Sequence, residues 1–389
     1  MDHPRGAVRP PVPKRAAGAG VALPGRGSRR TLPRMTGPAG RPRSSAGRRE
    51  RGIGRVRPVR PAPEPAPEPA PEPVAPDREA LARTIAMVND KGGVGKTSLV
   101  ANLAGQFAAA GYRCLLVDLN RQANLADDLG FRDGPADDQG AGLLMSVVAG
   151  TPLRPAADVR PGLDIVPGGA RLADLVPVMV SRVQERGRDA FGVLAEVLAP
   201  VAGDYDLVFV DCPPETTILT DLALTAARWV LMPTKSDGGG LVGMRLVGER
   251  FALARELNPD LGLLGAVLFA TGSRSRVVHA EVRDAVAQAF GGHSPLFTTS
   301  IRHAERTAQD ARRLGRLAHE LEQEAAAQPA WWAALRETAA GAPPPRRLST
   351  TAASVAGDYR DLGVELLTLL RTAEDPTSTA DARGQEATP

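Results

Sequence analysis

The stretch Asn89-Asp90-Lys91-Gly92-Gly93-Val94-Gly95-Lys96-Thr97-Ser98 decides how this chain folds. An apolar run at 84–88 precedes it, and residues 99–107 carry apolar side chains at helical spacing after it. The three glycines let the backbone pass close to an anion and turn N–H groups toward it. Lys96 supplies a charge for the outer phosphates, and Thr97 supplies a hydroxyl for Mg²⁺. A plain strand-to-helix turn needs the glycines but not Lys-Thr, so the stretch predicts a nucleoside triphosphate site.

A second feature of the same site lies about 115 residues downstream. Asp211 follows the apolar run 207–210 and precedes Cys212-Pro213-Pro214. A carboxylate at the end of a strand beside a phosphate loop can reach the Mg²⁺ shell. We therefore predict Thr97 and Asp211 as the metal-side residues, with a structural cap as the alternative role of the aspartate.

Strands and helices alternate along the rest of the domain. The expected strands are 84–88, 114–118, 163–166, 207–210, 229–232 (ended by Pro233), 261–270 and 296–301. The expected helices after the first are 170–186, 189–200, 241–257, 277–290, 302–326 and 359–371. Near-continuous apolar strands separated by helices are typical of a parallel sheet covered on both faces. The predicted fold class is α/β, with a mainly parallel doubly wound sheet.

Charge is distributed unevenly along the 389 residues. Residues 1–60 hold 16 lysines and arginines against Asp2 and Glu50, a net charge of +14, so the remainder carries −10 of the total of +4. We expect a disordered basic tail at 1–60, a proline-rich spacer at 61–80, a folded domain at 81–371 and a second loose tail at 372–389. The basic tail is either a DNA or RNA tether or a product of GC-rich coding without a binding role, or it precedes the true start.

Cysteine content and hydropathy bear on the compartment. Cys114 and Cys212 lie in apolar runs, which indicates a reducing environment and no disulfide framework. No apolar run is long enough to span a membrane, and the N-terminus has no continuous apolar signal core. We expect a cytoplasmic protein.

Three motifs together resemble the deviant Walker A ATPases, specifically the ParA branch of the ParA/MinD group of P-loop NTPases. They are Lys91-Gly92-Gly93-Val94-Gly95-Lys96-Thr97, Val117-Asp118-Leu119-Asn120-Arg121-Gln122-Ala123-Asn124 and Asp206-Leu207-Val208-Phe209-Val210-Asp211-Cys212-Pro213-Pro214. The resemblance covers about residues 83–301, and the segment 316–348 looks like a helical insertion.

The resemblance implies a cytoplasmic, nucleoid-associated ATPase with ATP and Mg²⁺ as ligands. Residues 92–98 (Gly92, Gly93, Val94, Gly95, Lys96, Thr97 and Ser98) would cradle the phosphates, with Lys96 on the protein's own β- and γ-phosphates. Lys91 would cross to the phosphates of a second subunit, so that ATP closes a homodimer. The dimer would bind DNA nonspecifically, and a centromere-binding, ParB-like partner would stimulate hydrolysis during plasmid or chromosome partitioning.

One departure from the family pattern affects the chemistry. The family has Asp-x-Asp-Pro-Gln after the second strand, whereas this chain has Asp118, Asn120 and Gln122 at the first, third and fifth positions. The second carboxylate is associated with the attacking water, and an amide cannot accept a proton in its place. We predict slow basal turnover, unless Asp118 or another group compensates.

Arginines near the ends of the last two strands are the candidate DNA contacts. They are Arg274, Arg276, Arg302 and Arg306, with Arg312, Arg313 and Arg316 continuing along a helix. Solvated surface charge is the alternative for each of them. Trp331 and Trp332 either anchor a partner or cover the domain's own apolar surface.

Four other function classes use the same loop or fold. A MinD-like membrane regulator needs a basic amphipathic C-terminal helix, whereas 359–371 is followed by an acidic tail, so no membrane binding is expected. Iron–sulfur carriers need more cysteines, and bacterial tyrosine kinases carry clustered C-terminal tyrosines where this chain has Tyr359. A slowly or non-hydrolysing ATP-dependent DNA-binding regulator stays open because of Asn120.

Overall fold

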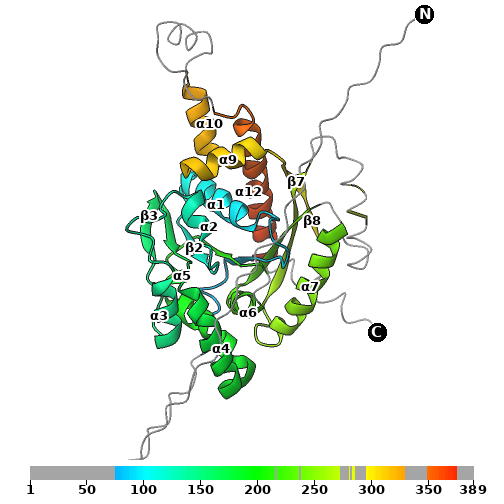
Figure 1. Cartoon of the computed structure of the whole chain (residues 1–389). Coiled ribbons are helices and arrows are strands. Elements are labelled where there is room, and N and C mark those ends of the chain that lie inside the picture. The colour runs from blue at the N-terminus through cyan, green and yellow to red at the C-terminus, as the bar shows by residue number, and fades with distance from the viewer. Residues whose placement is uncertain are drawn as a thin grey trace, which may run out of the picture. The chain divides into compact units, whose positions relative to one another are not determined.

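One eight-stranded sheet organises the protein (Figure 1). The computed structural model describes residues 75–214, 217–235, 238–271, 280, 283–284, 295–328 and 348–374. The strands are β1 (Thr84–Met87), β2 (Cys114–Asp118), β3 (Ala156–Arg160), β4 (Leu163–Val166), β5 (Leu207–Asp211), β6 (Trp229–Thr234), β7 (Gly262–Thr271) and β8 (Leu296–Arg302). Their order is β3-β4-β2-β5-β1-β6-β7-β8, and every described pair is parallel except β3–β4. The expected mainly parallel α/β sheet is confirmed.

Helices cover both faces of this sheet. The helices are α1 (Lys96–Ala109), α2 (Asn124–Asp128), α3 (Ala141–Ala149), α4 (Leu172–Arg186), the short 3₁₀ segment η1 (Gly187–Gly192), α5 (Val193–Ala202), α6 (Thr217–Ala226), α7 (Gly238–Arg255), α9 (Glu305–Leu314), α10 (Ala318–Ala327) and α12 (Ala352–Glu374). One buried core joins the sheet to helices α3 to α7, and the other joins it to α1, α2, α10 and α12.

The strand sequences explain the two cores. In β2, Leu115 and Val117 pack in the first core while Cys114 and Leu116 pack in the second, because successive side chains of a strand point to opposite faces. A strand that is buried on both faces needs apolar residues at every position, so its sequence shows a continuous run rather than an alternation. The carboxyl ends of β1, β2 and β5 then lie together at one edge of the sheet.

The prediction that Pro233 ends its strand is wrong. Pro233 lies inside β6 and is the register partner of Val267 in β7. Pairing of β6 with β1 ends at Leu231, so the N–H that proline lacks would face a side where no strand follows. The proline carbonyl on that side instead accepts a hydrogen bond from Asn89 Nδ2 at 2.8 Å.

The C-terminal helices also differ from expectation. The predicted single helix at 302–326 is two helices, because α9 ends at Leu314 and the next residue, Gly315, has a left-handed φ of 60°. Its predicted start is also too early, since β8 runs to Arg302. A Cβ on Gly315 would lie 2.3 Å from Gly130 Cα, so the helix ends where the backbones of Gly315 and Gly130 approach each other closely. The last helix begins at Ala352 rather than at 359. The helices α2 and α3 and the antiparallel edge strand β3 were not expected from the sequence.

Several predictions fall outside the described residues. These are the tail at 1–60, most of the spacer at 61–80, Arg274 and Arg276, most of the helix at 277–290, Trp331 and Trp332, and most of the tail at 372–389. Of the predicted insertion at 316–348, the described part contains α10, which packs against α12.

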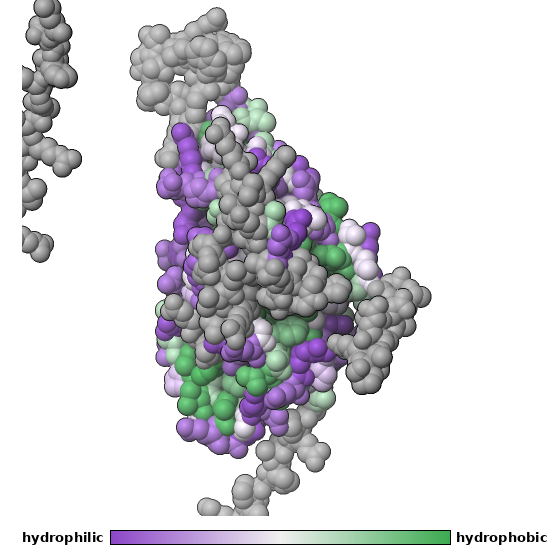
Figure 2. All heavy atoms as spheres, turned by 90° about the vertical axis from the view of Figure 1, so that its right-hand side faces the viewer, coloured by the Kyte–Doolittle hydropathy of each residue, from purple (hydrophilic) through white to green (hydrophobic). Residues whose placement is uncertain are grey.

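The described surface combines hydrophilic and apolar areas (Figure 2). Figure 2 shows the side of α7 and β8, where hydrophilic areas of the described surface lie between smaller apolar ones. Among the described helices, none is both long and apolar enough to cross a bilayer.

Candidate nucleotide site

The loop between β1 and α1 is shaped by its glycines. Gly93 and Gly95 have φ values of 70° and 92°, in the left-handed region that glycine occupies without steric cost. Gly95 directly precedes α1, and its carbonyl accepts the N–H of Leu99 at 2.9 Å. A Cβ at Gly95 would lie 2.5 Å from the ring of Phe269 in β7. The loop is therefore held between its own helix and the end of a strand two positions along the sheet.

Lys96 is folded back over this loop. Its side chain is buried, and Nζ donates hydrogen bonds to the carbonyl oxygens of Asn89 at 2.7 Å and Lys91 at 3.1 Å. Burial lowers the pKa of Lys96, and the nearby Asp211 acts in the opposite direction. An ammonium group inside a glycine loop can exchange such carbonyl contacts for phosphate oxygens.

Asn89 links the loop to the sheet. Its Nδ2 donates to Pro233 in β6, and its Oδ1 accepts the N–H of Lys91 at 2.9 Å. Lys91 lies half-buried at the start of the loop. The adjacent Asp90 pairs with Arg250 of α7 at 3.5 Å. Neither the anchoring role of Asn89 nor the ion pair of Arg250 was predicted from the sequence, since both depend on partners far along the chain.

Thr97 and the two strand-end carboxylates meet beside the loop. Thr97 Oγ1 donates to Asp211 Oδ2 at 2.7 Å, and Asp211 is the register partner of Asp118. Burial raises the pKa of Asp211 to about 7, while the hydrogen bond from Thr97 lowers it. Burial, and secondly the neighbouring Asp211, raises the pKa of Asp118 well above its usual range.

A divalent cation fits this group of oxygens. Asp211 Oδ1 and Asp118 Oδ2 are buried without a hydrogen-bond partner in the described part of the chain. Leaving two carboxylate oxygens unpaired is costly unless something positive binds there. Carboxylate and hydroxyl oxygens are the ligands that Mg²⁺ prefers. Thr97 and Asp211, the residues predicted to bind the metal, both belong to this group of oxygens and are hydrogen-bonded to each other.

Asn120 has a structural role in the loop after β2. Its N–H donates to Asp118 Oδ1 at 2.8 Å, and its own Oδ1 accepts the N–H of Gln122 at 3.0 Å. The side chain is largely buried, with 7% of its surface exposed. Gly168, after β4, lies so close that a Cβ there would be 2.6 Å from the Asn120 carbonyl. The loop and Asp118 are thus covered by the end of β4.

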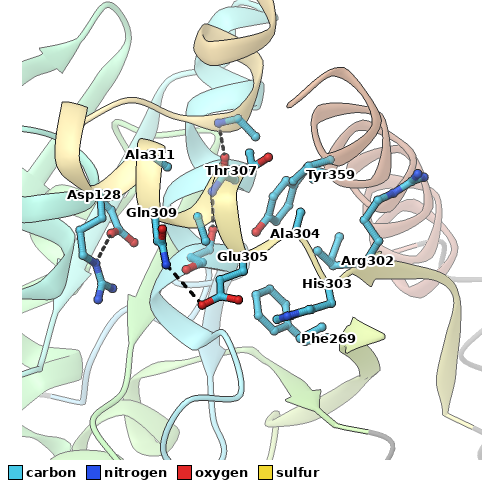
Figure 3. A pocket seen from close by; sticks show the side chains of 18 of the residues that line it. Asp128, Phe269, Arg302, His303, Ala304, Glu305, Thr307, Gln309, Ala311 and Tyr359 are labelled. Atoms are coloured by element: carbon cyan, nitrogen blue, oxygen red, sulfur yellow. Dashed lines mark hydrogen bonds and ion pairs between the residues drawn. The ribbon is translucent and has the colours of Figure 1, made fainter. Parts of the chain in front are cut away.

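A cavity of about 650 Å³ opens beside the phosphate loop. It lies between the loop and the ends of β7 and β8, and Figure 3 shows lining side chains from these strands, α9 and α12. The lining includes Gly93, Ser98, Phe269 and Glu305. This volume is typical of pockets that bind small molecules and cofactors.

Two of the four predicted DNA-contact arginines, Arg302 and Arg306, lie in the described part of the chain. Arg302 lines the cavity, and its guanidinium holds Asp358 of α12 through two hydrogen bonds of 2.7 Å. Arg306 is exposed on α9. Farther along α9 and after it, Arg312, Arg313 and Arg316 each pair with a carboxylate, at 3.3, 3.3 and 2.9 Å. The structure thus assigns Arg302 and these three arginines ion pairs within the protein.

Comparison with known proteins identifies the family. Residues 82–263 match the family described as an AAA domain. The chain is 33% identical to the chromosome partitioning protein ParA of Myxococcus xanthus, over 52% of this chain and 70% of that protein. It is 33% identical to the chromosome-partitioning ATPase Soj of Treponema pallidum, over 57% of this chain and 83% of that protein.

Solved structures support the fold. Apo McdA from Cyanothece superposes with a TM-score of 0.53 at 21% identity, covering 62% of this chain and 93% of that chain. A putative plasmid partition protein from Borrelia burgdorferi, solved with AMPPNP, gives a TM-score of 0.50 at 13% identity, over 75% and 99%. At these identities the likeness concerns the fold. With the sequence relatives and the geometry of the phosphate loop, it leads to one conclusion: the chain belongs to the ParA/MinD family of P-loop ATPases.

Proposed function

We propose that this protein is a Mg²⁺-dependent ATPase that dimerises on ATP, binds DNA nonspecifically and drives plasmid or chromosome partitioning with a centromere-binding partner. The observation that carries the proposal is the buried Lys96 in a glycine loop, next to the hydrogen-bonded pair Thr97 and Asp211. Relatives with names of chromosome-partitioning proteins support the biological role.

Phosphate binding would use groups that are already in position. The loop N–H groups and Lys96 would bind the β- and γ-phosphates, and Lys96 would give up its carbonyl contacts with Asn89 and Lys91. Mg²⁺, bound by Thr97 and Asp211 with Asp118 close by, would neutralise phosphate charge. The raised pKa of Asp211 means that its carboxyl group must lose a proton before it can bind the metal.

The nucleoside would occupy the cavity of about 650 Å³ beside the loop. Phe269 offers an aromatic face there, and Ser98 and Glu305 offer polar groups. This cavity is continuous with the loop through Gly93, so a triphosphate on the loop would leave its base in the cavity. We place adenine there because the relatives are ATPases by name.

Lys91 would act between two subunits. It lies at the start of the loop and is half-buried, and its backbone N–H is held by Asn89. A lysine from each subunit on the other's phosphates would neutralise charge that otherwise keeps the two ATP-bound faces apart. In this proposal ATP is part of the dimer interface, whereas ADP lacks the group that Lys91 would bind.

DNA binding would draw on arginines of the domain and of the tail. The candidates in the domain are Arg274, Arg276, Arg302 and Arg306, of which Arg302 also bonds to Asp358. Because the residues after the tail carry a net charge of −10, we propose that the 16 cations of residues 1–60 provide much of the attraction to DNA.

A second candidate is a slowly hydrolysing, ATP-dependent DNA-binding regulator. The specific observation is that Asn120 is an amide whose oxygen is used by the Gln122 N–H. Such a group cannot take a proton from water. A MinD-like membrane regulator has less support, since α12 buries Leu362, Leu366 and Leu370 in the core.

Two lysine variants test the proposal. Lys96→Ala is expected to abolish ATP binding, whereas Lys91→Ala is expected to bind ATP but stay monomeric. Nucleotide titration and light scattering with Mg·ATP and Mg·ADP measure the two effects separately. A wild-type protein that stays monomeric with saturating Mg·ATP, with and without DNA, would overturn the proposal.

A further inference from the structure

We infer that Arg121 is an additional phosphate-binding residue, which contacts the terminal phosphate of ATP bound to the same subunit. The inference rests on the proposed nucleotide site and concerns a position where the family pattern has proline and this chain has arginine. Its side chain lines a second, smaller cavity beside the carboxyl ends of β2 and β5, the strands that end in Asp118 and Asp211.

The loop that carries Arg121 is fixed from within. Asn120 bonds to Asp118 on one side and to Gln122 on the other, and the N–H of Ala123 donates to the Asn120 carbonyl at 3.0 Å. Ala123 has a left-handed φ of 48°, which marks a tight turn. A backbone held at these points presents the Arg121 side chain from a defined position.

Arg132 fixes the same loop from outside. Its Nη2 donates to the carbonyl oxygens of Gln122 at 3.1 Å and Ala123 at 2.7 Å. Nη2 and Nε also donate to the Asp127 carboxylate, at 2.7 and 2.8 Å. Arg132 is therefore a structural arginine. The two arginines of this loop region have different surroundings, and only Arg121 lines the cavity.

The cavity that Arg121 lines has a volume of about 350 Å³. Its other lining residues are uncharged: Asn120, Gln122, Ala170, Ala173, Pro213 and Pro214. Arg121 is thus the one charged side chain in the described lining. A concave site with one cation and no carboxylate favours an anion.

Arg121 itself is exposed and has no hydrogen-bond or ion-pair partner in the described part of the chain. The neighbouring arginines differ in this respect, because Arg132 pairs with Asp127 and Arg171 with Asp174. Asn120, the residue directly before Arg121, is an amide and carries no charge that could pair with the guanidinium.

The position of the cavity indicates which anion this is. Pro213 lies two residues after Asp211, and Asp211 bonds to Thr97 at the start of α1. Asn120, which also lines the cavity, lies two residues after Asp118 and donates its N–H to it. The cavity is thus lined by residues that follow both strand-end carboxylates by two positions, next to the site proposed for Mg²⁺ and the triphosphate. The outermost phosphate carries the most charge, and a guanidinium binds phosphate through two parallel N–H groups. The ligand class is a nucleoside triphosphate, as opposed to a diphosphate.

The test compares Mg·ATPγS and Mg·ADP binding to the full-length protein, at concentrations where the wild type stays monomeric. Arg121→Ala is expected to weaken ATPγS binding roughly ten- to a hundredfold, the range for losing a hydrogen bond to a charged group. ADP binding should change less than about twofold. Arg121→Lys should lie between the two. The matched control is Arg171→Ala, which removes an exposed arginine next to the cavity-lining Ala170 and should leave both affinities unchanged.

The outcomes separate this inference from the proposed function. A wild type that binds neither nucleotide overturns both. A wild type that binds both, with an unchanged ATPγS-to-ADP preference in Arg121→Ala, overturns the role of Arg121 alone. If Arg121→Ala weakens dimer formation but not monomer affinity, Arg121 binds an acidic group of a second copy, and the inference is wrong. Circular dichroism and thermal melting of each variant exclude misfolding as the cause.

Discussion

Asp118 and Asp211 are register partners at the ends of the adjacent strands β2 and β5, and both carboxylates are buried. Each has one oxygen bonded within the protein, to the Asn120 N–H and the Thr97 hydroxyl, and one oxygen without a hydrogen-bond partner in the described part of the chain. Burial raises the pKa of both carboxyl groups, and the neighbouring Asp211 raises that of Asp118 further. The pair is stable either when protonated or when a cation is bound.

The first prediction concerns the pH dependence of stability in the Mg²⁺-free protein. The Asp211 carboxyl titrates near 3.8 in the unfolded chain and near 7 in the fold, so the folded state binds more protons between these values. Its contribution to stability is fully present below about 4 and is lost as the pH rises through 7, on the order of a few kcal/mol in all. Asp211→Asn carries no titrating proton and should lose less stability between pH 5 and 8.

Thermal melts of both proteins from pH 5 to 8 measure this difference. The asparagine side-chain oxygen can still accept a hydrogen bond from the Thr97 hydroxyl. The variant should therefore keep this bond, which measures 2.7 Å in the wild type. We expect the melting temperature of Asp211→Asn to exceed that of the wild type increasingly toward pH 8. Parallel curves would show that the carboxyl group does not titrate in this window.

The second prediction concerns turnover. Asn120→Asp should raise the ATPase rate, because a carboxylate can accept a proton from the attacking water and an amide cannot. The fold should tolerate the change, since an aspartate oxygen can accept the Gln122 N–H as Asn120 Oδ1 does. General-base catalysis typically contributes about 10²–10⁴-fold, and we expect the increase to lie at or below the lower end.

Steady-state ATPase assays with and without DNA measure the effect of Asn120→Asp. Gln184→Glu is a control, because it is the same amide-to-carboxylate change at an exposed position of α4 that lines neither cavity. Equal rates in the wild type and Asn120→Asp would show that residue 120 does not limit hydrolysis.

The parallel sheet and the phosphate loop could be predicted because their signals are local. Runs such as 114–117 and 207–210 are apolar throughout, which is how a strand buried on both faces appears in a sequence. The glycines and Lys96 are contiguous, and the loop and helix form from neighbouring residues. The grouping of Thr97 with Asp211 followed from the general position of strand ends in parallel sheets.

The missed features depend on contacts distant in sequence. Pro233 stays in β6 because pairing with β1 has already ended, which no local pattern reveals. The break at Gly315 reflects its approach to Gly130, 185 positions away along the chain. The engagement of Arg302 by Asp358 likewise joins β8 to a helix that follows much later. The residues next to Arg302 in the sequence do not show whether its side chain faces solvent or pairs with a carboxylate, so this ion pair could not be predicted locally.

The third prediction concerns the phosphate loop backbone. Gly95→Ala combines a φ of 92° with a Cβ 2.5 Å from the Phe269 ring, so both strain and overlap arise. We expect a loss of roughly 2–4 kcal/mol in unfolding free energy. Gly92→Ala is the matched control, because a Cβ there meets nothing within 4 Å.

Chemical denaturation of Gly95→Ala, Gly92→Ala and the double variant Gly95→Ala/Phe269→Ala separates the two causes. Removing the ring relieves the overlap but leaves the positive φ, so part of the lost stability should return relative to Phe269→Ala alone. A Gly95→Ala protein as stable as Gly92→Ala would mean that the loop relaxes without cost.

The fourth prediction concerns the basic tail and DNA. Removing residues 1–60 takes away 16 cations, whereas the rest of the chain carries a net charge of −10. Each phosphate neutralised contributes about 0.9 to the slope of log affinity against log salt concentration on duplex DNA. If at least a quarter of the tail cations contact phosphates, the slope should fall in magnitude by about 3 or more.

Titrations of DNA with the protein in Mg·ATP, from low to physiological salt, measure this slope. A tail of the same length with its arginines replaced by glutamine is the control for length, and it should behave like the deletion. An unchanged slope in both proteins would assign DNA binding to the folded domain, where Arg306 would be the first residue to replace.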